Sequence, residues 1–295
     1  MNYFFHLTLI LSLIVLSSCS TGKKFKTDIP TEYQKSETIE HKNDIKQSPT
    51  PIKKIQTNNY LDFCYPLCPV NMAKTNIQVN HEDFFISYNV ETKYADWVAY
   101  KINPNNLLGT TKKRIWKADP KIPLETAIIP SDYKDAYVKC NYDRGHQAPL
   151  ADFSNSIKWE RVNYLSNITP QKSKLNRGPW NNLESKIRLL GKEKAKIYVI
   201  TGPYYNGKPT CQLPNARISN LIPNGYWKIV TVIKNNDIYR ASFKFDQDTP
   251  KDANFCNYLT SVNDISKITK LDFKIRDGID NSLLLLQKLG CNSPL

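Results

Sequence analysis

The chain is organised around three neighbouring segments: YDRGHQAPLADF at Tyr142–Phe153, WERVNYLSNITPQKSKLN at Trp159–Asn176 and RGPWNNLESKIR at Arg177–Arg188. They hold one of only four histidines in the sequence, together with several amides and arginines. Hydrolysis of a phosphodiester needs a base to activate water and positive charge to stabilise the phosphorus centre as it becomes more negative. Because the segments supply both kinds of side chain, we expect a phosphodiesterase site with one metal ion here.

The first segment is expected to bring a base and a cation into one cleft. His146 can act as a general base near neutral pH. Arg144 lies two residues earlier, and alternate residues of a strand face the same side. Gly145 between them permits a close approach of the backbone.

An amide and a carboxylate follow along the chain. Asn176 offers an amide oxygen, a hard ligand suited to Mg²⁺, which often keeps several waters. Glu184 lies eight residues further and Arg188 four beyond that, so one continuous helix would align all three. Glu184 would then accept from metal-bound water, and Arg188 would contact phosphate or Glu184. Pro179 suits only the first turn of a helix, which places Asn176 at the helix entrance.

Each of these signals also has an ordinary structural explanation. Asp-Arg-Gly-His alone can be a turn, and Asn-rich segments are usually loops. A Glu/Arg pair four residues apart is usually a solvated salt bridge. Trp180 is more often a core residue than a platform for a nucleobase. On the residues alone, both interpretations stay open.

Hydrophobic patterning predicts an α+β fold with a mostly antiparallel central sheet flanked by helices. Strands are expected where aromatic and β-branched residues cluster, at 83–88, 96–102, 137–142, 196–204, 226–233 and 238–245. The last two flank an Asn-Asn-Asp turn and predict a hairpin. Helices are expected at 180–190, ending at Gly191, and at 254–271 and 282–289. Residues 117–135 are expected to be an irregular loop.

The charge of the chain indicates the class of its partner. Lys and Arg number 41 against 27 Asp and Glu, a net charge of +14. Such a surplus predicts attraction to a polyanion, which can be nucleic acid, an anionic membrane or an acidic glycan. A basic protein that is merely soluble is the alternative that charge alone leaves open.

The N-terminus is expected to direct export. Leu7–Leu16 is an apolar run that is too short to span a bilayer and is typical of a signal peptide. LSSC at Leu16–Cys19 resembles a bacterial lipobox, in which Cys19 becomes the lipid-modified first residue. The protein would then be a lipoprotein anchored to a membrane, in the periplasm or at the cell surface. MNYFFH carries no Lys or Arg, and ordinary cleavage near Ser18, giving a secreted protein, is the alternative.

Composition divides the chain into three parts. Residues 1–19 form the signal peptide with its lipobox, and residues 20–60 form a polar tether that is expected to be disordered. Residues 61–295 form the folded domain. Of seven cysteines, six remain after Cys19, and an even number in an exported chain suggests disulfides. Cys64 and Cys68 would close a small loop.

Three motifs resemble one known family. DRGHQAPLADF, NYLSNITPQKSKLNRGPWNNLE and VITGPYY, in this order and spacing, are similar to the DNA/RNA non-specific endonucleases, the sugar-nonspecific group of ββα-metal nucleases. The similarity spans roughly Cys64 to Cys291 and includes IPNGYWK and FDQDTP. It implies the ββα-metal nuclease fold and hydrolysis of DNA and RNA to 5′-phosphate products. It also implies one Mg²⁺, with Mn²⁺ as a substitute.

The resemblance implies a role for each site residue. The family's general base matches His146, its single direct protein ligand to the metal matches Asn176, and Glu184 matches the carboxylate that holds metal-bound water. The remaining matches are amides that organise the site and arginines that bind phosphate or stabilise the transition state: Asn163 and Asn167, and Arg114, Arg144 and Arg188.

By similarity, Cys64 pairs with Cys68 and Cys256 with Cys291. The typical member lacks equivalents of the remaining two cysteines, which we expect by elimination to form a third bridge, Cys140–Cys211. The family contains dimers, so a homodimer is compatible with the resemblance, as is a cognate inhibitor protein. The lipobox and tether are additions to the family pattern.

Two alternatives compete with an endonuclease. One is a non-catalytic surface lipoprotein that binds nucleic acid. The other is a phosphodiesterase acting on small or lipid substrates near a membrane. The intact central motif argues against the first, and the net charge argues against the second.

Overall fold

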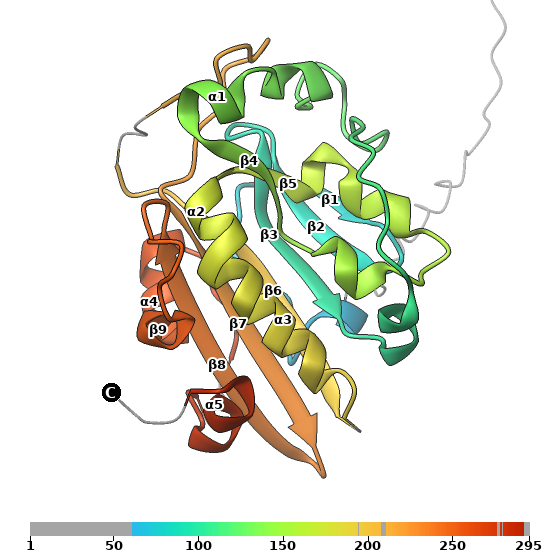
Figure 1. The fold of residues 1–295 in the computed structure, drawn as a ribbon, viewed down its shortest axis with the longest axis vertical. Coiled ribbons are helices and arrows are strands. Elements are labelled where there is room, and N and C mark those ends of the chain that lie inside the picture. The colour runs from blue at the N-terminus through green and yellow to red at the C-terminus, as the bar shows by residue number, and fades with distance from the viewer. Residues whose placement is uncertain (1–60, 194, 208–210, 276–277, 279, 292–295) are drawn as a thin grey trace, which may run out of the picture. The chain divides into compact units, whose positions relative to one another are not determined.

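An antiparallel sheet forms the centre of the computed structural model, which describes residues 61–193, 195–207, 211–275, 278 and 280–291 (Figure 1). Within these residues the main sheet has seven strands in the order β1-β2-β3-β6-β7-β8-β9, and β4 and β5 form a separate two-stranded ribbon. All of these pairings are antiparallel. The strands are β1 (Ile77–Asn80), β2 (Phe84–Asn89), β3 (Tyr94–Lys101), β4 (Tyr142–His146), β5 (Ile168–Lys172), β6 (Lys196–Tyr204), β7 (Gly225–Lys234), β8 (Asp237–Asp246) and β9 (Leu259–Thr260).

Short helices connect and cover the strands. The α-helices are α1 (Ala136–Cys140), α2 (Ser173–Leu175), α3 (Asn181–Leu190), α4 (Val262–Thr269) and α5 (Leu283–Leu289), and a π-helical turn, η7 (Asn176–Trp180), joins α2 to α3. The 3₁₀ turns are η1 (Leu61–Phe63), η2 (Pro104–Leu108), η3 (Pro130–Tyr133), η4 (Leu150–Phe153), η5 (Trp159–Asn163), η6 (Leu165–Asn167) and η8 (Phe255–Tyr258). The mixture of an antiparallel sheet with separate helices confirms the expected α+β class.

The two faces of the sheet are buried against different layers. Along β7, Tyr226 and Val230 face the larger core, which also contains residues of α3 and α5. The alternate residues Trp227 and Ile229 face a second core, which α4 and the Cys64–Cys68 loop share. This alternation follows from the two-residue period of a strand. Figure 1 shows α3 lying across the face that it covers, in front of the central strands.

Most of the predicted elements are present. The strands expected at 83–88, 96–102 and 196–204 correspond to β2, β3 and β6. The predicted hairpin is β7–β8, and its two turn residues, Asn235 and Asn236, have positive φ of 53° and 70°, which suits the tight turn between twisted strands.

The prediction of a strand at 137–142 is wrong. Residues Ala136–Cys140 form the short helix α1, and the strand β4 begins only at Tyr142. Tyr137 and Val138 favour strands, but both are exposed here, while Ala136 and Cys140 are buried one helical turn apart. Asn141 ends the helix in the left-handed conformation, and its N–H donates to the Tyr137 carbonyl at 2.8 Å.

The helix predicted at 254–271 is only partly correct. That range contains η8, the short edge strand β9 and then α4, which begins after Ser261 caps its first turn. The helix predicted at 282–289 is α5, and the helix predicted at 180–190 is α3. Residues 117–135 are irregular apart from η3.

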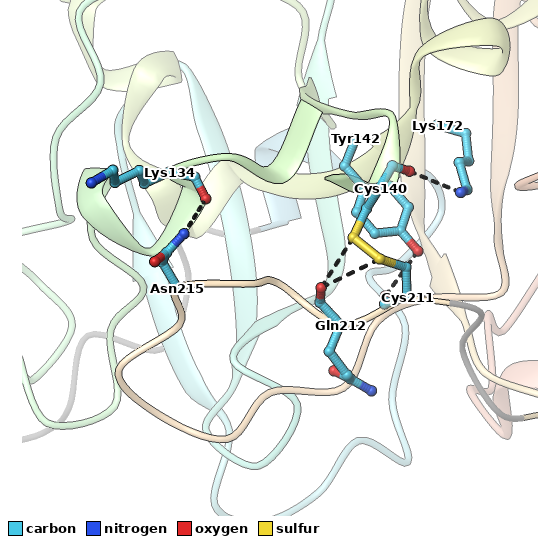
Figure 2. Close-up of a disulfide and its surroundings, with 7 residues drawn as sticks. All are labelled: Lys134, Cys140, Tyr142, Lys172, Cys211, Gln212 and Asn215. Carbon is cyan, nitrogen blue, oxygen red and sulfur yellow. Dashed lines mark hydrogen bonds between the residues drawn. A yellow bond between two sulfur atoms is a disulfide. The ribbon is translucent and has the colours of Figure 1, made fainter. Parts of the chain in front are cut away.

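Three disulfides lie within the described residues: Cys64–Cys68, Cys140–Cys211 and Cys256–Cys291. These are the expected pairings, including the third bridge. Figure 2 shows how Cys140–Cys211 joins the end of α1 to the segment before β7, where the Tyr142 hydroxyl also donates to the Cys211 carbonyl at 3.1 Å. The bond therefore fixes the chain directly before the strand that carries His146.

The segments expected to be a signal peptide with the lipobox cysteine Cys19 and a tether at 20–60 lie outside the described residues. In the part of the chain that the structure does describe, no helix combines the length and the apolar character needed to cross a bilayer.

Candidate active site

The ribbon β4–β5 presents two of the expected site residues side by side. Arg144 and His146 are alternate residues of β4, and both line one cleft. Gly145 between them faces β5 so closely that a Cβ at this position would lie 2.4 Å from Gln171 Oε1. The glycine therefore allows the close pairing that aims its two neighbours into the cleft, as the sequence predicted.

The hydrogen bonding of His146 prepares it to act as a base. Its Nε2 lies 3.2 Å from the Asn163 amide oxygen. Because that oxygen can only accept, Nε2 carries the proton and Nδ1 keeps its lone pair. Burial lowers the pKa of His146 to about 4, and the neighbouring Arg114 acts in the same direction. The imidazole is therefore neutral at pH 7.

Asn167 holds the backbone around His146 rather than contacting the cleft. Its amide oxygen accepts from the Ala148 N–H at 2.9 Å, and its amide nitrogen donates to the carbonyls of Ala148 and Val162 at 2.9 and 2.8 Å. It is fully buried. The side chain thus joins the loop after β4 to the turn η5, which ends at Asn163.

Asn176 lies in η7, just before α3, as Pro179 predicted. The turn is kinked at Gly178, whose φ and ψ of −114° and −119° are not helical. The Asn176 amide nitrogen donates to Asp143 Oδ2 at 2.9 Å. Among the described residues, its amide oxygen accepts no hydrogen bond, so it is free to bind a hard cation.

Asp143, for which the sequence predicted no role, organises this corner of the cleft. Besides accepting from Asn176, it receives two hydrogen bonds from Arg177, from Nε at 2.8 Å and from Nη2 at 2.6 Å. Arg177 also stacks over the Tyr137 ring, 5.1 Å from its centroid. The position of Asp143 as the first residue of the Asp-Arg-Gly-His motif was the sequence signal that could have indicated this role.

Glu184 and Arg188 lie one turn apart on α3, and both line the cleft. One expectation was that Arg188 pairs with Glu184. Instead, Arg188 forms an ion pair with buried Asp152. Glu184 is 8% exposed, and its Oε1 has no hydrogen-bond partner in the described structure. Asp152 and the buried Lys228 behind Glu184 were missed, although both belong to motifs quoted above, DRGHQAPLADF and IPNGYWK.

Two arginines in the cleft have no carboxylate partner among the described residues. Arg144 donates to the Pro130 carbonyl at 3.2 Å and lies over the rings of Tyr133 and Trp116. Arg114 comes from the irregular segment before Lys117, whose carbonyl accepts from the Leu165 N–H at 2.9 Å. Their charges are thus free to meet an anion.

These groups open on a single cleft of about 630 Å³. The expected residues that line it are His146, Arg144, Arg114, Asn176, Glu184 and Arg188. Asn163 and Asn167 lie behind His146. No group of three or more His, Cys, Asp or Glu suited to a metal occurs in the described residues. The oxygen donors that the described lining offers a cation are the Asn176 amide and the carboxylates of Glu184 and Asp143, of which Asp143 is already bound by Asn176 and Arg177.

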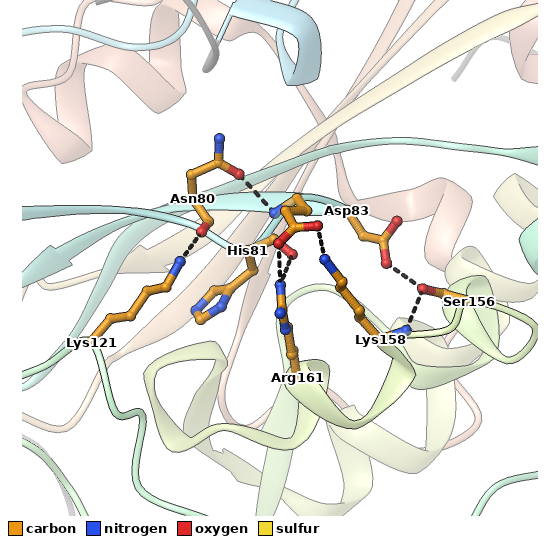
Figure 3. Close-up of polar contacts among 8 residues, drawn as sticks. Asn80, His81, Asp83, Lys121, Ser156, Lys158 and Arg161 are labelled. Atoms are coloured by element: carbon orange, nitrogen blue, oxygen red, sulfur yellow. Dashed lines mark hydrogen bonds and ion pairs between the residues drawn. The ribbon is translucent and has the colours of Figure 1, made fainter. Parts of the chain in front are cut away.

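The turn between β1 and β2 is joined by polar contacts to the segment that includes η5 (Figure 3). The His81 carbonyl accepts from Arg161 at 3.2 Å, and Glu82 pairs with Lys158 and Arg161. The buried His81 ring contacts Asp119 through Nε2 and Oδ2 at 2.8 Å. The turn η5, which delivers Asn163 to His146, is thereby tied to the edge of the sheet.

A family model for DNA/RNA non-specific endonuclease matches residues 59–280. The chain belongs to this family. It is 38% identical over 243 residues to a nuclease of Serratia marcescens, covering 79% of this chain and 90% of the relative. It is 27% identical over 217 residues to a nuclease of a Nostoc species, covering 70% and 76%.

A solved structure of an EndoG/EndoGI complex shares the fold, with a TM-score of 0.58 and 20% identity over 70% of this chain and 90% of that one. Family membership explains why the motifs occur together, and it confirms the resemblance found in the sequence. The chain is a hydrolytic endonuclease of the non-specific family.

Proposed function

We propose that the protein hydrolyses the backbone of both DNA and RNA with His146 as general base and one Mg²⁺ held at Asn176. One observation carries this proposal. A neutral imidazole with a free Nδ1, a free amide oxygen and two arginines without carboxylate partners open on the same cleft. Such a site can activate water and receive a phosphodiester at once.

His146 takes a proton from the attacking water at Nδ1. The Asn163 amide oxygen holds the Nε2 proton, so the ring keeps its orientation and the imidazolium that forms remains hydrogen bonded. Arg114 and Arg144 bind the phosphate oxygens and stabilise the charge that increases on them in the transition state. Arg188 is neutralised by Asp152, so its part is smaller.

The donor set fits Mg²⁺. The Asn176 amide oxygen is a hard, neutral ligand, and the carboxylate of Glu184, which lines the same cleft, can accept a hydrogen bond from a coordinated water. Asp143 fixes the Asn176 amide so that its oxygen faces away from the Asp143–Arg177 pair. When bound, Mg²⁺ neutralises phosphate charge and stabilises the departing 3′-oxygen.

Specificity for sequence should be low. Arginines that contact phosphate carry no information about the bases. The proposed products end in 5′-phosphates, as the family resemblance implies.

We also propose that the protein works outside the cytoplasm. Three disulfides in the described residues suit an oxidising compartment. The lipid anchor at Cys19 belongs to the same proposal, and metabolic labelling with a lipid, compared between wild type and Cys19→Ala, tests it.

Digestion of plasmid DNA and RNA with and without EDTA tests the activity. We expect cleavage of both with Mg²⁺, no cleavage with EDTA, and a loss of at least about a hundredfold in His146→Ala, the usual contribution of a general base. Full activity in His146→Ala would overturn the mechanism. Salt-sensitive binding without cleavage would support a binding protein, and turnover of small phosphodiesters alone would support the other alternative.

A further inference from the structure

Lys228 is a buried cation that the mechanism above does not use. It lies on the central strand β7, on the face covered by α3, and its side chain is 0% exposed. Lysine is almost never fully buried unless it is paired. Yet Nζ donates no hydrogen bond in the described structure. It lies 4.3 Å from the centroid of the Trp180 ring and 4.0 Å from Glu184 Oε1.

The charges around Lys228 show which carboxylate its positive charge balances. Asp152, on η4, is already paired with Arg188 of α3. Glu184 and Lys228 form the second pair. The two carboxylates and the two cations, all buried or half-buried, therefore sum to zero charge. The Tyr100 hydroxyl of β3 also lies in this environment, and burial raises the pKa of Tyr100, so it is neutral. Lys228 is therefore the cation available to balance Glu184.

We propose that Lys228 is a positioning residue that favours the ionised form of Glu184 from its buried side, without donating a hydrogen bond to it. This inference rests on the proposed function. A separation of 4.0 Å supplies charge without a hydrogen bond, and the Trp180 ring holds the ammonium at that distance.

The pKa shifts agree with this geometry. Burial raises the pKa of Glu184, and Lys228 opposes the rise. Burial lowers the pKa of Lys228, while Glu184 and Asp152 oppose that change. With Lys228 present, the pKa of Glu184 is about 7. Removing the ammonium takes away the largest effect that opposes burial, so this pKa would rise further and the carboxylate would be protonated at pH 7.

The test uses Lys228→Met, which keeps an unbranched chain without charge, and the neutral pair Lys228→Met/Glu184→Gln as a control for folding. The Glu184 carboxyl is followed by ¹³C NMR in metal-free protein and assigned with Glu184→Gln. We expect its titration midpoint to rise by at least one pH unit in Lys228→Met. An unchanged midpoint would overturn the proposal.

Cleavage supplies the second readout. In Lys228→Met we expect the Mg²⁺ concentration for half-maximal cleavage at pH 7 to rise about tenfold or more, and activity to recover as pH is raised. A loss that follows the melting temperature and does not change with pH would mean a purely structural role and would overturn the proposal.

Lys228→Arg decides the matter if the Met variant does not fold. We expect the titration midpoint of Glu184 in Lys228→Arg to stay within about half a pH unit of wild type, because the positive charge is kept; a rise of one unit or more would overturn the proposal. Wild-type protein that fails to cleave with Mg²⁺ would instead refute the proposed function, and the metal-free titration would still decide the role of Lys228.

Discussion

At the scale of single residues, the neutral state of the His146 imidazole is caused by the groups packed around it in the folded protein and not by its neighbours in the sequence. Burial and Arg114 together hold its pKa at about 4, below the ordinary value of 6.5. Protonation therefore favours the unfolded chain. The stability that this histidine contributes is fully present above pH 6.5 and is lost as pH falls toward 4.

We predict that His146 titrates near pH 4 in metal-free protein and carries its proton on Nε2 at pH 7. Long-range ¹H–¹⁵N NMR, with the signals assigned by His146→Asn, measures both properties. A midpoint at 6.5 or above, or a proton on Nδ1, would contradict the assignment of Nδ1 as the base.

We predict that Asp143→Ala reduces kcat/KM by about tenfold to a hundredfold, the usual effect of losing a group that orients a metal ligand. The change frees the Asn176 amide and releases Arg177 into the cleft. Glu125→Ala, which removes an exposed carboxylate, is the matched control and should leave the rate unchanged. Equal rates in the two variants would show that Asp143 has no positioning role.

The spacing of Arg144 and His146 predicted that they share one cleft, and the structure brings both to it, because alternate residues of a strand face the same side. The partner of Arg188 could not be found in this way. Asp152 lies 36 residues before it in the chain, and their contact depends on how η4 packs against α3. The contact between Lys228 and Glu184 could not be predicted for the same reason, because no residue near Lys228 in the sequence indicates that it faces Glu184.

At the scale of elements, the entrance to α3 determines where Asn176 lies. A regular helix through this region would have aligned Asn176 with Glu184 and Arg188, but the kink at Gly178 interrupts it. A Cβ at Gly178 would lie 2.3 Å from the Lys251 carbonyl oxygen, so the glycine also permits close packing against the loop after β8. Pro179 in the sequence indicated the interruption, but not the form that it takes.

We predict that Gly145→Ala lowers the free energy of unfolding by about 1–3 kcal/mol, the cost of overpacking a fitted contact, and reduces cleavage more than tenfold. The added Cβ would lie 2.6 Å from the Cβ of Gln171 and push β4 away from β5. Denaturant unfolding and plasmid cleavage measure the two effects. Gly207→Ala is the control, because its Cβ would have 3.6 Å to the nearest atom, and a similar loss there would refute the explanation.

The wrong prediction for 137–142 is also an effect at this scale. The β-forming side chains of Tyr137 and Val138 are exposed, so they gain nothing from packing in a strand. The disulfide at Cys140 and the buried Ala136 determine the local conformation instead. Tertiary contacts outweigh local propensity in a segment this short.

At the scale of the whole molecule, the net charge of +14 gave the class of partner but not the place where it binds. We expect binding in the cleft, because Arg114 and Arg144 are the arginines of the described cleft without carboxylate partners. Affinity for nucleic acid should therefore depend on salt and not on sequence.

We predict that the logarithm of the DNA affinity of His146→Ala falls linearly with the logarithm of salt concentration, with a slope steeper than about −2. Adding Arg114→Gln should make the slope shallower by about 1, because one phosphate contact is lost. Fluorescence anisotropy on duplexes of different sequence measures the slope. A slope near zero, or a strong preference for one sequence, would contradict backbone binding.

The bond between Cys140 and Cys211 closes a covalent ring of chain that contains β4, β5, α3 and β6. His146, Asn163, Asn176, Glu184 and Arg188 all lie inside this ring. A protease that cuts one peptide bond anywhere between the two cysteines cannot separate the pieces. A singly nicked enzyme would therefore run as one band in a non-reducing gel and as two after reduction. A nuclease built in this way can be cut once by a protease and still keep these groups on one connected molecule.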